Sequence, residues 1–206
     1  MYFEIRAAHI IFAINKSQSM IFKRKIYDEL LRWKRTDEGR TAVLIQGARR
    51  VGKSTVAEEF ATNEYDTHIL VDFAACSSEI RDLFNDVSDL NRIFMRLQLE
   101  YGIELKERKS AIIFDEVQLA PKARQAIKYL VKDGRYDYIE TGSLISIRKN
   151  VKDILIPSEE VKVHMFPMDY EEFKWALGDT ATIKLLQSCF HNRTSLGDAT
   201  NRKLMR

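Results

Sequence analysis

The chain has few cysteines and few prolines among its 206 residues. Its two cysteines, Cys76 and Cys189, lie far apart, and no C-x-x-C pair occurs. This argues against a zinc site or a disulfide framework and is typical of a reducing compartment, so we expect a cytoplasmic protein. The three prolines, Pro121, Pro157 and Pro167, form no proline-rich linker.

A long apolar run is also lacking. A membrane-spanning helix needs about 20 apolar residues, and the longest run near the N-terminus, residues 7–14, contains His9. A signal peptide would begin with basic residues and end at a small-residue cleavage site, which Glu4 and the segment INKSQS do not match. We therefore expect no membrane partner.

The composition is that of an ordinary globular protein, with 45% hydrophobic and 31% charged residues. The length suits one domain with a small appendage. Residues 1–35 carry eight basic and three acidic side chains, residues 36–190 carry 21 and 26, and residues 191–206 carry four and one. Basic ends can contact nucleic acid or an acidic partner, but solvated helix faces are the more common explanation. Nucleic acid is therefore a weakly supported partner.

Short apolar segments alternate with segments of helical periodicity. The predicted strands are 41–47, 67–73, 110–116, 136–143 and 160–167. The predicted helices are 21–35, with Ile26, Leu30 and Trp33 on one face, one after Gly52, 80–101 with a break near Ser88, and one from Pro121 to Asp133. This alternation, with strands that are apolar throughout, indicates an α/β fold with a parallel sheet covered on both faces.

After Pro167 the pattern becomes helical only. Asp169 and Glu172 have the spacing of a capping box. Further helices are expected over 180–190 and from Leu196 to the end, so residues 169–206 are expected to form part of a helical lid or linker.

The segment GARRVGKST has the pattern G-x-x-x-x-G-K-[ST], carried by Gly47, Gly52, Lys53 and Ser54. Such a loop turns backbone N–H groups toward phosphate oxygens, and the helix that follows adds partial positive charge. Lys53, which we expect to be exposed in the empty loop, would reach the phosphates, and Ser54 would ligate Mg²⁺. A chance basic turn is the alternative, but the preceding strand and following helix favour a nucleotide loop. Its predicted binding residues are Gly47, Ala48, Arg49, Arg50, Val51, Gly52, Lys53, Ser54 and Thr55.

Two carboxylates follow the predicted strand AIIFDE. Asp115 could hold Mg²⁺, which accepts few protein carboxylates and keeps waters, and Glu116 could polarise the attacking water. The alternative is a polar helix cap. A G-x-G-x-x-G fingerprint is absent, which disfavours a dinucleotide site. The acid pair favours hydrolysis over transfer to a substrate hydroxyl. Glu140 lies on a central predicted strand, and we expect it to pair with Arg49 or Arg50 rather than to act in catalysis.

Four segments, GARRVGKST, IIFDEVQLAP, YIETGSLIS and FPMDYEEFKWAL, carry a family resemblance. From about Ile21 onward the chain resembles the AAA+ superfamily of P-loop ATPases. Within it, the chain is similar to prokaryotic ATP-binding proteins that have an AAA domain followed by a C-terminal domain of unknown function. Such chains begin near Met20 and continue past the position of Arg206. The resemblance therefore implies a dispensable extension over 1–19, an ATPase core over 20–168 and a C-terminal truncation.

The resemblance implies a five-stranded parallel sheet in the order 5-1-4-3-2, with the IETGS strand between the loop strand and the Asp115 strand. Thr141 and Ser143 would then lie beside the γ-phosphate as polar sensors, unless TGS only caps the next helix. Gln118 matches a glutamine common in the family, without an evident role. No arginine finger is evident; Arg148 and Arg193 are candidates, and another subunit of a homo-oligomer is a further source.

The leading hypothesis is an ATPase that uses ATP and Mg²⁺ to switch an attached module and act on an unknown protein client, with slow turnover in this chain. One alternative is a module that binds ATP with negligible hydrolysis. Another is a DNA-associated ATPase, which only the basic ends support.

Overall fold

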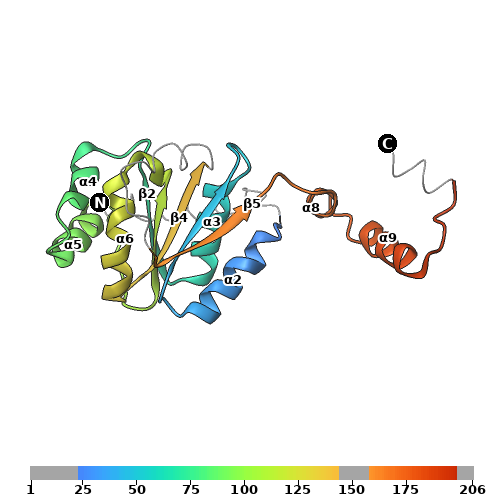
Figure 1. The fold of residues 1–206 in the computed structure, drawn as a ribbon, viewed down its shortest axis with the longest axis horizontal. Helices are drawn as coiled ribbons and strands as arrows, with labels where there is room; N and C mark the ends of the chain where they lie inside the picture. The colour runs from blue at the N-terminus through green and yellow to red at the C-terminus, as the bar shows by residue number, and fades with distance from the viewer. Residues whose placement is uncertain (1–22, 144–157, 199–206) are drawn as a thin grey trace, which may run out of the picture.

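The computed structural model describes residues 23–143 and 158–198, which form a parallel five-stranded sheet with helices on both faces (Figure 1). The strands are β1 (Ala42–Gly47), β2 (Thr67–Asp72), β3 (Ser110–Asp115), β4 (Asp137–Ser143) and β5 (Glu160–Met165). Their order is β2-β3-β4-β1-β5, and every neighbouring pair is parallel. The expected order 5-1-4-3-2 is confirmed, and the fold is that of a P-loop NTPase.

Two separate apolar clusters hold the helices to the sheet. On one face lie α2 (Ile26–Asp37) and α3 (Lys53–Glu64); on the other lie α4 (Ser78–Asp82), α5 (Leu90–Tyr101) and α6 (Pro121–Asp133) (Figure 1). The 3₁₀ turn η1 (Leu83–Asn85) extends α4, and a second 3₁₀ turn, η2 (Val117–Leu119), follows β3. Apolar side chains alternate between the two clusters along β1, so both faces of this central strand are buried.

The buried face of α2, the cap of α5 and the start of α6 agree with their sequence signals. Ile26, Leu30 and Trp33 form the buried face of α2, as predicted, although the described helix begins at Ile26. The predicted break before α5 is confirmed, because Asp89 caps that helix by accepting a hydrogen bond from the Arg92 amide. Pro121 opens α6.

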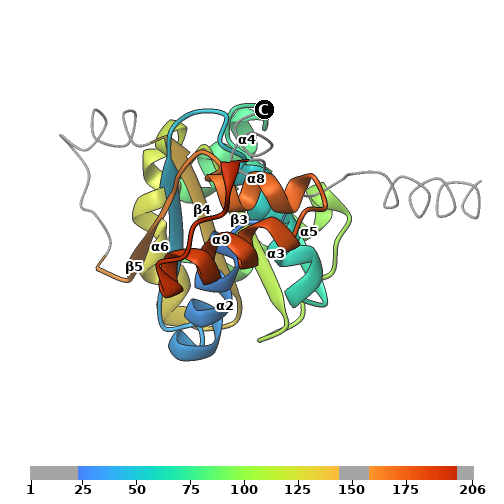
Figure 2. The ribbon, with the colours of Figure 1, turned by 90° about the vertical axis from the view of Figure 1, so that its right-hand side faces the viewer.

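The two C-terminal helices, α8 (Tyr170–Ala176) and α9 (Ala181–Asn192), extend away from the sheet beyond the end of β5 (Figure 1). Figure 2, which views the molecule from that end, shows both helices in front of the sheet. The capping box predicted for α8 is present. Residues 194–197 have no regular structure, so the helix predicted from Leu196 does not begin there, and residues 199–206 lie outside the described part of the chain.

The described helices are short; α6, with 13 residues, is the longest of them. Within the described ranges, no helix has both the length and the apolar character needed to cross a membrane.

Candidate functional site

The predicted site residues meet at the carboxyl edge of the sheet, where α/β folds usually bind ligands. β1 ends at Gly47, which lies opposite Ser143 in β4, and Thr141 lies opposite Ile45. Asp115 ends β3, the strand on the other side of β4. The expectation that the IETGS strand separates the loop strand from the Asp115 strand is therefore confirmed.

The loop that leaves β1 contains two residues with a left-handed backbone. Arg50 has φ 62° and Gly52 has φ 94°, both in the left-handed region. Alternation between left-handed and right-handed residues turns successive N–H groups to one side, which forms a nest for anions. Gly52 is also the N-cap of α3, whose N-terminus adds partial positive charge. The side chains of Arg49 and Arg50 are exposed.

Gly47 is required for a reason that the sequence did not indicate. A Cβ placed on Gly47 would lie 2.1 Å from the backbone oxygen of Met165, at the end of β5. Such a contact is impossible without a backbone shift. The first glycine of the loop therefore permits β5 to pack against β1. The sequence pattern indicated only that the loop turns backbone N–H groups toward phosphate oxygens.

Lys53 is buried, so the expectation of an exposed side chain is wrong. Only 5% of Lys53 is accessible, and its Nζ donates a hydrogen bond of 2.8 Å to the carbonyl oxygen of Ala48 in the same loop. Burial lowers the pKa of Lys53, while Glu116 and Asp115 act in the opposite direction. The ammonium group is thus held across the loop by a backbone oxygen.

Ser54, Asp115 and Thr141 share one hydrogen-bonded centre. The Ser54 hydroxyl donates to Asp115 Oδ1 at 2.6 Å, and the Thr141 hydroxyl donates to the same oxygen. Thr141 is fully buried and Asp115 nearly so. The two residues assigned to Mg²⁺ from the sequence, Ser54 and Asp115, are therefore in direct contact.

Glu116 has an unusual backbone that neighbouring residues fix in place. Its φ of 53° is left-handed, which is rare for a residue with a side chain and is often seen at functional sites. The Glu116 amide donates to Thr141 Oγ1 at 3.2 Å. Its carboxylate accepts a hydrogen bond from Gln118 Nε2, and Gln118 is buried in η2. The side chains of Thr141 and Gln118 thus hold the backbone and carboxylate of Glu116.

Thr141 and Ser143 differ in their surroundings. The Thr141 hydroxyl is engaged with Asp115 and with the Glu116 amide, so it positions the acid pair. Ser143 lies beside Gly47 in the pairing of β4 with β1 and is also buried. A sensor role for either residue stays a prediction.

The expected pairing of Glu140 with Arg49 or Arg50 is wrong. Glu140 is completely buried, whereas both loop arginines are exposed. Its carboxyl group lies near Glu160 of β5 and Arg124 of α6. Arg124 forms a bidentate pair with Glu160, with Nε–Oε2 and Nη2–Oε1 distances of 3.1 and 2.9 Å. The Glu140 side chain therefore belongs to the α6 face and not to the loop.

Of the two arginine-finger candidates, Arg193 is the one that the structure describes, and it does not join this site. Arg193 lies at the C-terminal end of α9, far from the sheet (Figure 1). Arg148 lies outside the described residues.

The sequence profile of a family described as "AAA domain" matches residues 39–174, more than half of the chain. No curated protein sequence matches significantly. Among solved structures, C. elegans PCH-2 matches with a TM-score of 0.42 and 10% identity over 82% of this chain and 50% of that chain. The Thermotoga maritima RuvB Holliday junction branch migration motor matches with a TM-score of 0.45 and 12% identity over 79% and 52%. The chain thus spans about half the length of each.

Proposed function

The chain belongs to the AAA domain family of nucleotide-binding, ATPase-type domains, and we propose that it binds ATP with Mg²⁺ and hydrolyses it. The observation that carries this proposal is the 2.6 Å hydrogen bond from Ser54 to Asp115. It joins the start of α3 to the end of β3 and brings together a hydroxyl and a carboxylate. Magnesium favours oxygen ligands of this kind in nucleotide sites.

We assign residues 47–55 to phosphate binding. The left-handed residues Arg50 and Gly52 provide the nest geometry. Lys53 donates to the Ala48 carbonyl, a partner that a phosphate oxygen of greater negative charge would replace. The lowered pKa of Lys53 favours the same exchange, because a phosphate group would offset the cost of burying the ammonium charge.

We assign the metal to Ser54 and Asp115, whose oxygens fit a hard cation. When bound there, Mg²⁺ would neutralise charge on the phosphates. Thr141 donates to Asp115 Oδ1 and so fixes the rotamer of the carboxylate.

We assign the attacking water to Glu116. A general base must be held within hydrogen-bond reach of the proton it accepts. Gln118 holds Oε2, and the Thr141 hydroxyl accepts from the Glu116 amide, so the position of Oε1 is constrained from two sides. Glu116 would accept a proton from the water as the water oxygen bonds to the terminal phosphorus and the bond from that phosphorus to the bridging oxygen breaks, which releases ADP and phosphate.

We also propose that ATP switches an attached module that acts on a protein client. A second copy of the chain in a homo-oligomer would supply an arginine to the site. A role in DNA binding is less favoured. Arg24 and Lys25, two of the basic residues near the N-terminus, form ion pairs with acidic residues at the start of α8. These pairs leave less positive charge for phosphate backbones.

Calorimetric titration with ATP, with Mg²⁺ and with chelator, tests this proposal, together with a phosphate-release assay. Glu116→Gln should keep ATP affinity and lose at least about 100-fold in turnover, because general-base catalysis contributes about 10² to 10⁴. Asp115→Asn should instead weaken the dependence of ATP affinity on Mg²⁺. Absence of ATP binding by the wild-type chain would refute the proposal, and unchanged turnover in Glu116→Gln would refute the role of that residue.

A further inference from the structure

Arg24, just before α2, is a buried arginine outside the motifs of the site. Only 8% of the residue is accessible. Burying a guanidinium group is costly unless hydrogen bonds and a counter-ion compensate. Its partners therefore indicate what it does in the fold.

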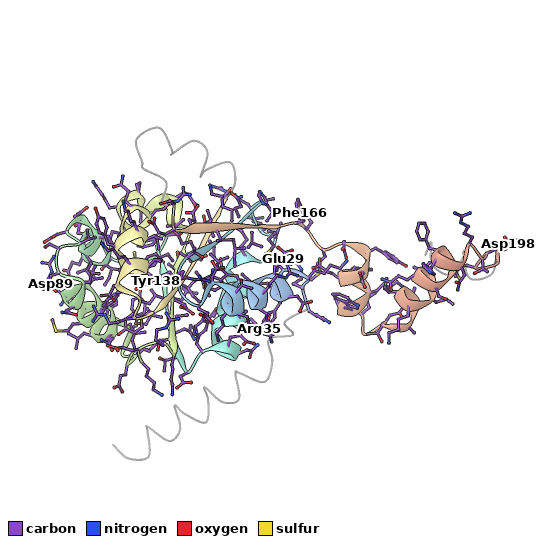
Figure 3. The ribbon with its side chains drawn as sticks, turned by 60° about the horizontal axis from the view of Figure 1, so that its bottom comes forward. Glu29, Arg35, Asp89, Tyr138, Phe166 and Asp198 are labelled. Carbon is purple, nitrogen blue, oxygen red and sulfur yellow. The ribbon has the colours of Figure 1, made fainter. Side chains whose placement is uncertain are left out.

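Two of these partners are backbone carbonyls from separate segments. Arg24 Nη1 donates to the carbonyl oxygen of Val51 at 2.9 Å, within the predicted phosphate loop. Arg24 Nη2 donates to the carbonyl oxygen of Phe166 at 2.7 Å. Figure 3 shows Phe166 at the start of the connection from the sheet to α8. One guanidinium thus bridges the loop and the connection to the C-terminal helices.

The counter-ion is Glu172, in the first turn of α8. Arg24 Nε lies 3.2 Å from Glu172 Oε1, and both side chains are less than a tenth exposed. Glu172 Oε1 also accepts from the Lys25 amide at 2.7 Å, and Oε2 accepts from the Asp169 amide in the capping box. Glu172 therefore fixes the start of α8 to the segment that carries Arg24.

We propose that Arg24 is a positioning residue that couples nucleotide occupancy of the Gly47–Thr55 loop to the position of α8. This inference rests on the proposed function. In a trans peptide the carbonyl and the next N–H point in opposite directions. Because Arg24 holds the Val51 carbonyl, it directs the Gly52 N–H to the other side of the loop. Arg24, which lies outside the loop, thereby fixes the direction of the Gly52 N–H group beside Lys53.

The coupling follows from the shared guanidinium. A rotation of the Val51–Gly52 peptide on nucleotide binding would change the hydrogen bond to Arg24, whose Nη2 donates to the Phe166 carbonyl and whose Nε is ion-paired with Glu172. Conversely, moving α8 would shift Arg24 and with it the Val51 carbonyl. Such coupling between two sites is reciprocal. Glu172 is the informative residue, because its side chain reaches the loop through Arg24.

Lys25 offers a matched control. Its Nζ lies 2.6 Å from Asp169 Oδ2 and 2.7 Å from Glu171 Oε2, so it also ties the chain before α2 to α8. Among the described residues, the Lys25 side chain donates no hydrogen bond to the loop. Lys25→Ala therefore removes a link to α8 and leaves the contact between Arg24 and Val51 intact.

The test measures Mg²⁺–ATP affinity by calorimetry in the wild type, Glu172→Gln, Arg24→Ala, the double variant and Lys25→Ala. Glutamine is also a capping-box residue, so the single oxygen of Glu172→Gln can keep the bond from the Asp169 amide, while the charge and the acceptor that faces Arg24 and the Lys25 amide are removed. We expect Glu172→Gln to weaken ATP affinity about fivefold or more, the lower end of typical coupling. It should have no further effect in the Arg24→Ala background, and Lys25→Ala should bind as the wild type does.

The position of α8 can be followed through Trp175, since the chain has two tryptophans. With fluorotryptophan labelling and Trp33→Phe for assignment, ATP should shift the Trp175 resonance in the wild type and in Lys25→Ala. The shift should be lost in Arg24→Ala. Circular dichroism establishes that each variant is folded; if Arg24→Ala is not, the comparison of Glu172→Gln with Lys25→Ala decides.

The outcomes separate the two proposals. If the wild type binds no ATP, the proposed function fails and the coupling fails with it. If the wild type binds ATP but folded Glu172→Gln has the same affinity and the same Trp175 shift, the coupling alone is overturned. An equal loss of affinity in Lys25→Ala and Glu172→Gln would also overturn it, because general loosening of α8 would then explain both.

Discussion

Replacing Glu140 by glutamine should stabilise the protein at neutral pH. Glu140 has no accessible surface, and neither carboxyl oxygen has a hydrogen-bond donor among the described residues. Burial is the main cause that raises its pKa well above the ordinary value of 4.5; the neighbouring Glu160 raises it further, and Arg124 acts in the opposite direction. Arg124 is already paired with Glu160 through three hydrogen bonds. We therefore expect Glu140 to be protonated in the folded state and to donate to Glu160.

The pKa of Glu140 is higher in the folded chain than in the unfolded chain, and this difference makes the free energy of unfolding depend on pH. Below about pH 4.5 Glu140 is protonated in both the folded and the unfolded chain, so its proton has no effect on the free energy of unfolding. Above that pH the unfolded chain releases the proton while the folded chain retains it. Stability therefore falls as pH rises, until pH passes the pKa of the folded state. The slope for one proton is at most about 1.4 kcal/mol per pH unit.

Glutamine at position 140 keeps the shape and can donate its amide hydrogen to Glu160. Urea unfolding of the wild type and Glu140→Gln at several pH values between 5 and 9 measures the effect. The two proteins should be closest in stability at pH 5, and the variant should become increasingly the more stable of the two as pH rises. The comparison stays below pH 9 because Tyr65 and Tyr138 also have raised pKa values and titrate at higher pH.

Parallel curves for the two proteins across this range would show that Glu140 is ionised in the folded state, and the reasoning would be refuted. ATP binding and turnover serve as a second readout. They should be unchanged in Glu140→Gln, because the side chain faces α6 while Thr141 faces the proposed site.

Three further substitutions test the proposed site. Lys53→Ala should abolish most ATP binding by calorimetry while changing stability by no more than about 1 kcal/mol, since one hydrogen bond is lost; equal affinity would show that the loop is misassigned. Gly47→Ala should cost about 1–3 kcal/mol in urea unfolding, because its Cβ overlaps the Met165 carbonyl, and a smaller loss would mean that β5 can move aside. Thr141→Val should lower turnover more than ATP affinity and cost about 1–3 kcal/mol through the unsatisfied Glu116 amide, whereas Thr141→Ser should restore both; an unaffected Thr141→Val would remove that residue from the network.

The sequence was sufficient for the sheet and for most helices because those signals are local. Apolar strands, the Asp89 cap and the Pro121 start depend on residues within one element. The strand order came from a family resemblance, since hydrophobic periodicity alone does not determine which strands are neighbours. It was confirmed by the observed pairing.

The errors concern side-chain environments that are created by folding. The sequence predicts an exposed Lys53 in the empty loop, but the folded loop buries this side chain and binds its Nζ through the Ala48 carbonyl. The sequence predicts that Glu140 pairs with a loop arginine, because an isolated carboxylate is costly to bury on a central strand. The alternation of side chains along a strand instead directs Glu140 and Thr141 to opposite faces, and the basic partner on the Glu140 face comes from α6.

Residues that would touch a nucleotide and residues that hold them in place differ in how they can be found. The former lie in contiguous segments, so Gly47–Thr55 is recognisable without a structure. The latter act across the fold: Arg24 reaches Val51 from 27 positions away, and Thr141 reaches the Glu116 amide from 25. No sequence pattern marks either pair, because the number of residues between two contacting positions can vary freely once the sheet brings those positions together. Gln118 is the intermediate case, since it lies two positions from Glu116, and its side-chain amide donates to the Glu116 carboxylate across a left-handed residue. The geometry of the acid pair therefore depends on tertiary contacts even where the residues themselves are adjacent in sequence.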